Sequence, residues 1–107
     1  MDGVDDLVAR NYADPDRLFV TGGSGGGILT AWTVGKTDRF AAAASVKPVI
    51  NWMTMALAAD IGQFVRRHWI RADPWEDPDA YLDFSPIMLI ENVTTPTLMM
   101  VGEEDWR

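Results

Sequence analysis

The chain has 107 residues, which suits one small domain or a part of a larger one. Apolar residues make up 48% of it and include five tryptophans, so the sequence predicts a packed core rather than disorder. The formal net charge of −7 disfavours nucleic acid and anionic membrane surfaces as partners, because no cluster of Lys and Arg is present to neutralise phosphates.

The chain contains no cysteine, which excludes disulfides and thiolate chemistry and leaves the compartment open. No apolar run approaches the roughly 18 residues that a membrane span needs. The first ten residues, MDGVDDLVAR, are acidic rather than basic and apolar. No signal peptide is therefore predicted, and the cytoplasm is the default expectation.

The first predicted element is a helix near the N-terminus that Asp2 caps, with one apolar face formed by Val4, Leu7, Val8 and Tyr12. Pro15 then ends this helix within the turn ADPDR at 13–17. Residues 18–20 are a short continuous apolar run, which is typical of a strand buried on both faces.

Beyond a glycine-rich stretch, an apolar stripe predicts a helix from Ile28 to about Gly35. Residues 40–46, FAAAASV, are interpreted as a second buried strand. Two further helices are predicted at 51–59 and 60–71. The second of these has an apolar face made of Ile61, Phe64, Val65, His68 and Trp69.

Residues 72–86 contain three prolines and several acidic residues, and they predict a loop. A third buried strand is predicted at 97–101, followed by GEEDWR. Strands that are apolar throughout and alternate with helices indicate an α/β fold with a parallel sheet of about three strands flanked by helices. Three strands are few for such a sheet, which is a first sign that the domain is incomplete.

The stretch VTGGSGGGIL at 20–29 does not match the glycine motifs that bind nucleotides. GKT occurs at 35–37, but Thr30 stands where a P-loop requires glycine, and the dinucleotide motif fails because its last position is Ile28. Anion binding at a glycine-rich helix start remains a weaker alternative. A flexible linker is disfavoured because the stretch lies between a buried strand and an apolar helix.

Residues 22–26 instead match G-x-S-x-G between a strand and a helix, the pattern of a nucleophile elbow. Ser24 is then the nucleophile, held in a strained conformation at the tip of a sharp turn. Strand and helix pack closely behind it, so we expect Gly22 and Gly26 to be small for steric reasons. The backbone N–H of Gly25 is predicted to contribute to an oxyanion hole.

A serine nucleophile also requires an acid and a histidine, which follow it in that order in proteins with a nucleophile elbow. Asp105 is the preferred acid and Glu104 the second choice, because the last predicted strand is followed by a glycine and then by three carboxylates at 103–105. Alternatively, these carboxylates only form a solvated strand end and have no catalytic role. The single histidine, His68, precedes Asp105 and lies on an apolar helix face, so it is not expected to be the catalytic base.

Other conspicuous residues have simpler interpretations. Trp52, Trp69 and Trp75 could line a substrate pocket, although packing is the commoner use of tryptophan. The acidic residues of the 72–86 loop lack the spacing of a calcium loop and indicate a solvated surface: Asp73, Glu76, Asp77 and Asp79.

Three stretches carry a resemblance to a known family: DPDRLFVTGGSGGGILTAW at 14–32, TDRFAAAASV at 37–46 and SPIMLIENVTTPTLMMVGEEDWR at 85–107. Together they resemble the catalytic domain of the prolyl oligopeptidase family of serine peptidases. Within it they are most similar to acylaminoacyl-peptidase and dipeptidyl-peptidase-like members. The likeness covers nearly the whole chain and is weaker at 51–80.

The resemblance implies that residues 1–107 are a partial α/β-hydrolase domain, cut at both ends. It matches Ser24 to the nucleophile, Gly25 to the oxyanion hole and Asp105 to the acid. Many members carry an aromatic residue where this chain has Gly25. The resemblance also implies that the catalytic histidine lies beyond Arg107 and that earlier strands precede Met1.

The implied function is peptidase action on short peptides through an acyl-enzyme, with no metal or cofactor. The isolated chain, lacking the triad histidine, is expected to be inactive and to associate through exposed sheet edges. The alternatives are a carboxylesterase or lipase of the same fold, or a non-catalytic binding or oligomerising module.

Overall fold

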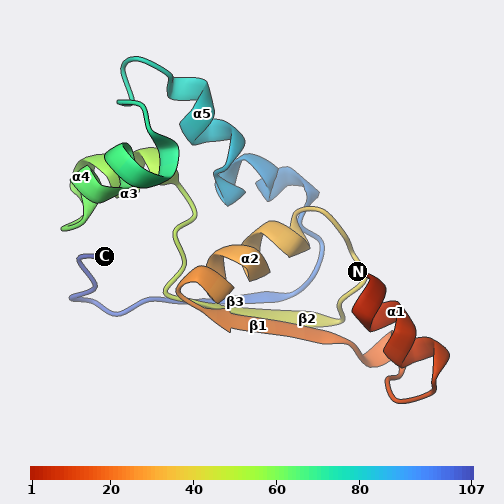
Figure 1. Cartoon of the computed structure of the whole chain (residues 1–107). Helices are drawn as coiled ribbons and strands as arrows, with labels where there is room; N and C mark the ends of the chain where they lie inside the picture. The colour runs from red at the N-terminus through yellow and green to blue at the C-terminus, as the bar shows by residue number, and fades with distance from the viewer.

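The computed structural model describes all 107 residues, and its centre is a three-stranded parallel sheet. The strands are β1 (Phe19–Gly23), β2 (Ala42–Val46) and β3 (Thr97–Met100), and their order in the sheet is β1-β2-β3. Figure 1 shows the three strands running in the same direction beneath helix α2. The predicted α/β fold with three parallel strands is therefore confirmed.

Helices α1 (Asp2–Ala9) and α2 (Gly25–Val34) confirm two predicted elements. Helix α2 lies over one face of the sheet, whereas α1 lies near the end of the sheet where β1 begins (Figure 1). The predicted cap at Asp2 is wrong, because the helix begins at Asp2 itself and has no side-chain cap. Tyr12 lies beyond the end of α1 and is exposed.

The segment between β2 and β3 forms a separate group of helices (Figure 1). It consists of α3 (Trp52–Ala58), α4 (Gly62–Phe64), a π-helix η2 (Val65–Ile70), α5 (Pro78–Asp83) and a 3₁₀ helix η3 (Pro86–Asn92). A second 3₁₀ helix, η1 (Pro15–Arg17), precedes β1. No helix in the structure has the length and apolarity that crossing a bilayer demands.

Two predictions for this segment need correction. The single helix expected at 60–71 is one short α-helical turn followed by a π-helix. The loop expected at 72–86 contains α5, whose start is fixed by the carboxylate of Asp77 accepting a hydrogen bond from Ala80 N–H at 3.1 Å and by Pro78 at the first helical position. An Asp-Pro pair is also a turn signal, which is why the sequence alone favoured a loop.

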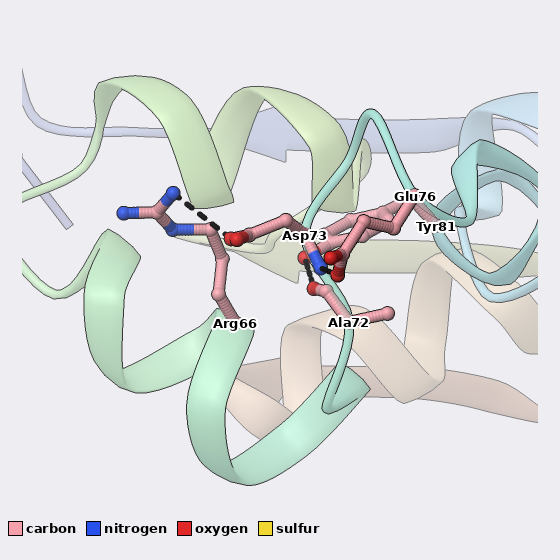
Figure 2. A network of polar contacts seen from close by, with 5 residues as sticks. All are labelled: Arg66, Ala72, Asp73, Glu76 and Tyr81. Carbon is pink, nitrogen blue, oxygen red and sulfur yellow. Dashed lines mark hydrogen bonds and ion pairs between the residues drawn. The ribbon is translucent and has the colours of Figure 1, made fainter.

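Buried apolar residues, among them Ala31, Val34 and Ala43, lie between α2 and the sheet, and a hydrophobic cluster lies within the group of helices. Its buried members are Met55, Ala56, Val65 and Tyr81, and α3 contributes two of them. Figure 2 shows the polar contacts beside it: Arg66 binds the carboxylate of Asp73 at 3.0 Å, and the Tyr81 hydroxyl donates to the carbonyl of Ala72. These contacts fasten the 72–76 loop to the π-helix.

The two faces of the sheet differ. Helix α2 covers one face, while the other face leaves Phe19, Leu98 and Met100 exposed at 67%, 55% and 51%. The expectation that the strands are buried on both faces is therefore wrong for these residues. Parallel sheets are normally covered on both faces, so this apolar surface lacks a covering layer within the 107 residues.

Candidate active site

The candidate active site lies where the three strands end. Because the strands are parallel, the segments that follow them meet at one edge of the sheet. The Ser24 N–H donates to the carbonyl of Val46 at 2.9 Å, and the Lys47 N–H donates to the carbonyl of Met100 at 2.6 Å. These two bonds join the ends of β1, β2 and β3 in sequence.

Ser24 has the backbone geometry of a nucleophile elbow. Its φ of 55° and ψ of −118° lie in a region that non-glycine residues rarely adopt. The residue connects β1 directly to α2, and its hydroxyl makes no capping hydrogen bond to the helix. The side chain is exposed, so the hydroxyl is available for reaction.

Close packing behind Ser24 explains the requirement for glycine at two positions. A Cβ atom added to Gly22 would lie 2.3 Å from the carbonyl oxygen of Gly26, and one added to Gly27 would lie 2.6 Å from that of Val46. A Cβ atom added to Gly26 meets nothing within 4 Å, so the expectation for position 26 is wrong. Gly27 is the second sterically required glycine, because it faces the end of β2.

A buried hydroxyl braces the same junction. Ser45 on β2 is completely buried and donates from Oγ to the carbonyl of Gly27 at 2.8 Å. One turn into α2, Thr30 donates to the carbonyl of Gly26 at 2.9 Å. The Ser45 bond holds the start of α2 against the sheet, whereas the Thr30 bond lies within the helix, and no motif in the sequence indicates either of them.

Gly25 is the first residue of α2, where a backbone N–H has no acceptor inside the helix. Such a donor sits at the positive end of the helix dipole and is suited to stabilise an oxyanion. A Cβ atom at position 25 would meet nothing within 4 Å, so packing does not require glycine there.

Ser24 and the predicted acid line the same cavity. This cavity has a volume of about 760 Å³, and its wall includes Ser24, Gly25, Glu104 and Asp105. Glu103, the third carboxylate of the C-terminal cluster, does not line it. The carboxylate of Asp105 accepts a hydrogen bond from the Arg107 N–H at 3.1 Å.

The apolar wall of the cavity comes mainly from the group of helices and includes Val49, Met55, Ile61 and Trp69. Trp69 and Ile28 also line an adjoining apolar cavity of about 430 Å³, where Trp69 packs edge-to-face against Trp52 at 5.5 Å between ring centroids. Trp75, the third tryptophan considered for a pocket, lines neither cavity and is exposed.

Three further charged residues line the cavity, and no sequence pattern indicates them: Lys47, Asp60 and Arg107. The Arg107 guanidinium donates two hydrogen bonds to the Asp60 carboxylate, at 2.8 and 3.2 Å. These bonds hold the pKa of Asp60 below its usual value. Lys47 has a φ of 43°, which is rare for a residue with a side chain.

His68 does not line the cavity around Ser24. It is exposed on the π-helix, where its ring packs against Phe64 at 4.6 Å between centroids. One cavity therefore brings together the Ser24 hydroxyl, the start of α2 at Gly25 and the carboxylate of Asp105, and His68 is not among its lining residues.

Comparison with known proteins shows which family this chain matches. The model of the prolyl oligopeptidase family matches residues 1–107. The chain is 42% identical to the uncharacterized peptidase YuxL of Bacillus subtilis (strain 168), an alignment that covers 100% of this chain and 16% of the relative. It is 38% identical to the acylamino-acid-releasing enzyme of Arabidopsis thaliana, covering 97% of this chain and 15% of the relative.

Among solved structures, the acylaminoacyl peptidase of Pyrococcus horikoshii superposes with a TM-score of 0.86 at 30% identity. The alignment covers 96% of this chain and 17% of that protein. The chain thus spans about one sixth of the length of the proteins it matches, and its fold is that of a section of their peptidase structures.

Proposed function

The chain belongs to the prolyl oligopeptidase family of serine peptidases, and from this premise we propose that it carries the nucleophile and the acid of a peptidase active site. In this proposal Ser24 is the nucleophile, Gly25 N–H is an oxyanion donor and Asp105 is the triad acid. The base is a histidine supplied by a part of the protein other than these 107 residues.

The reaction follows from these assignments. The histidine removes the hydroxyl proton as Ser24 Oγ attacks the scissile carbonyl, and Asp105 holds the imidazole in the required tautomer. The Gly25 N–H donates to the oxyanion that forms. The histidine then protonates the leaving amine, and water releases the acyl group from Ser24.

The observation that carries the proposal is the conformation of Ser24. Ser24 is exposed, has no cap bond and is held at φ 55° and ψ −118°. A turn that only connects a strand to a helix does not require such a strained backbone. The position of Ser24 on the same cavity wall as Asp105 supports a catalytic use of that conformation. Backbone strain of this kind is retained where function requires it.

Short peptides are the proposed substrates. Two relatives support this class by name, since one is a peptidase and the other releases acylamino acids. The apolar wall that includes Met55, Ile61 and Trp69 favours an apolar side chain beside the scissile bond. We expect the 107-residue chain by itself to be inactive, because the base is absent from its cavity.

The proposal is tested on the complete gene product with two matched substrate sets, acyl-peptides and p-nitrophenyl esters of the same acyl groups. We expect hydrolysis of both, and we expect Ser24→Ala to lose at least about a thousandfold of kcat. If only the esters were hydrolysed, the protein would be an esterase of the same fold and the proposed peptidase activity would be wrong. Full activity of Ser24→Ala would refute the assignment of the nucleophile.

A further inference from the structure

The loop that carries Asp105 has little structure of its own. Residues 102–107 are exposed and belong to no helix or strand. Within the loop, Asp105 N–H donates to the Gly102 carbonyl and Trp106 N–H donates to the Glu104 carbonyl, both at 3.2 Å. These bonds shape a turn, but they do not fix its position over the cavity.

All hydrogen bonds that join residues 102–107 to the rest of the chain are made with Asp60. Its backbone N–H donates to the carbonyl of Trp106 at 3.1 Å. Its carboxylate accepts from Arg107 Nη2 at 2.8 Å and from Arg107 Nε at 3.2 Å. Asp60 therefore holds the loop through main chain and side chain together, across 47 positions of sequence.

The loop has space on both sides. Asp105, Trp106 and Arg107 line the cavity around Ser24 and also a second cavity of about 520 Å³. The loop thus lies between two hollows, and the hydrogen bonds that join it to the rest of the chain are those with Asp60. Its position depends on the contacts with Asp60.

We propose that Asp60 is a positioning residue that holds the Asp105 loop in its working place beside Ser24. This inference rests on the proposed function, because it gives Asp60 a role through the triad acid. The Asp60 carboxylate is engaged by Arg107, so it is not assigned any contact with the substrate. It acts by fixing where Asp105 presents its carboxylate to the histidine.

The contacts of Asp60 with Trp106 and Arg107 form a clamp on the loop, and the charges around this clamp are consistent with its role. Lys47, Glu104 and Asp105 share the cavity with the Asp60–Arg107 pair. A bidentate contact between guanidinium and carboxylate fixes orientation as well as distance. The pair is well placed to hold the loop although it is exposed, because the backbone bond to Trp106 acts beside it.

The test compares Asp60→Asn with a matched control, Asp6→Asn, in the complete gene product. Asp6 forms a similarly exposed pair with Arg10 at 3.1 Å on α1, at the far end of the molecule. Asparagine keeps the backbone N–H and the size of the side chain but removes the charge. A phosphonate titration of reactive serine gives the concentration of folded sites, so that kcat is expressed per site.

We expect Asp60→Asn to lower kcat per titrated site on the order of 10- to 100-fold with little change in KM, because small displacements of catalytic groups have effects of that size. Asp6→Asn is expected to stay within about twofold of the parent. In a background of Asp105→Asn, the second change at Asp60 is expected to have no further effect, because both act through one carboxylate.

Several outcomes would overturn the inference. Asp60→Asn matching the control, or a loss at Asp60 that simply multiplies with the loss at Asp105, would show that the clamp does not act through the acid. A lower titre of sites with normal kcat per site would assign Asp60 a purely structural role. If Ser24→Ala kept full activity, the proposed function would fail instead, and the two failures are thereby told apart.

Discussion

At the scale of single residues, the glycines around Ser24 have unequal roles. Gly22 and Gly27 lie against backbone atoms of the neighbouring helix and strand, whereas Gly23, Gly25 and Gly26 face open space. Alanine substitutions along this stretch are therefore expected to differ in their effect on stability. The difference also separates what the turn needs sterically from what the chemistry needs.

Gly22→Ala is expected to destabilise the fold strongly, by about 3 kcal/mol, because the new Cβ would stand 2.3 Å from a backbone oxygen that cannot move alone. Gly26→Ala is the matched control and is expected to change the free energy of unfolding by less than about 1 kcal/mol. Urea denaturation of both variants measures the difference. Equal stability of the two would contradict the packing described for the elbow.

The elbow was predictable because one local motif specifies a strand, a serine and a helix start. The choice between Gly26 and Gly27 was not, since it depends on where the carbonyl of Val46 lies in a strand 19 positions away. For the same reason, sequence patterns could name Asp105 but not Asp60. The clamp joins segments that only the fold brings together.

At the scale of elements, α5 and the 72–76 loop are held to the π-helix by the network in Figure 2. Tyr81 is its buried member, and the loss of its hydroxyl leaves the Ala72 carbonyl without this donor. The chain has one other tyrosine, Tyr12, which is exposed and serves as a control.

Tyr81→Phe is expected to lower the free energy of unfolding by about 1 kcal/mol, the usual net value of one hydrogen bond. Tyr12→Phe is expected to leave it unchanged within about 0.5 kcal/mol. Chemical denaturation at pH 7 measures both. Indistinguishable variants would mean that the Tyr81 hydroxyl contributes nothing to the attachment of the loop.

The same residue predicts a pH dependence. Burial raises the pKa of Tyr81 above 10.0, and the nearby carboxylate of Asp73 acts in the same direction. The folded protein therefore keeps its proton at a pH where the unfolded chain releases it, so stability falls as pH rises above about 10. We expect Tyr81→Phe to remove this part of the decline. An identical decline in the variant would refute the assignment.

The helical elements were predicted unevenly, and the reasons are physical. The apolar stripe from Ile28 located the end of α2 but missed its start at Gly25, and the helix predicted at 51–59 agrees closely with α3. The π-helix escaped prediction because its side-chain spacing resembles that of an α-helix over six residues. The sequence pattern also could not show that one face of the sheet is left open, since strand periodicity says nothing about what packs against it.

At the scale of the whole molecule, the structure is elongated, with the sheet and α2 at its centre and the group of helices to one side (Figure 1). The uncovered face of the sheet presents Phe19, Leu98 and Met100 to solvent. β1 and β3 are also edge strands with unpaired backbone groups. Both features favour association of the isolated chain.

We therefore expect the isolated chain to associate at micromolar concentration and Leu98→Lys to weaken this association. The new charge would lie both on the apolar face and on an edge strand. Leu57→Lys on α3 is the control, because Leu57 is 60% exposed but lies away from the sheet. Sedimentation velocity distinguishes the variants, and equal association would show that another surface is responsible.

The proposal on which the others depend is that the glycine-flanked turn holds Ser24 as the nucleophile of a serine peptidase. Its most direct test is to treat the complete gene product with a fluorophosphonate and to locate the covalent adduct by mass spectrometry of proteolytic peptides. We predict a single adduct on Ser24 that forms together with the loss of activity. An adduct on any other residue that accompanies this loss, or loss of activity with Ser24 unmodified, would contradict the account.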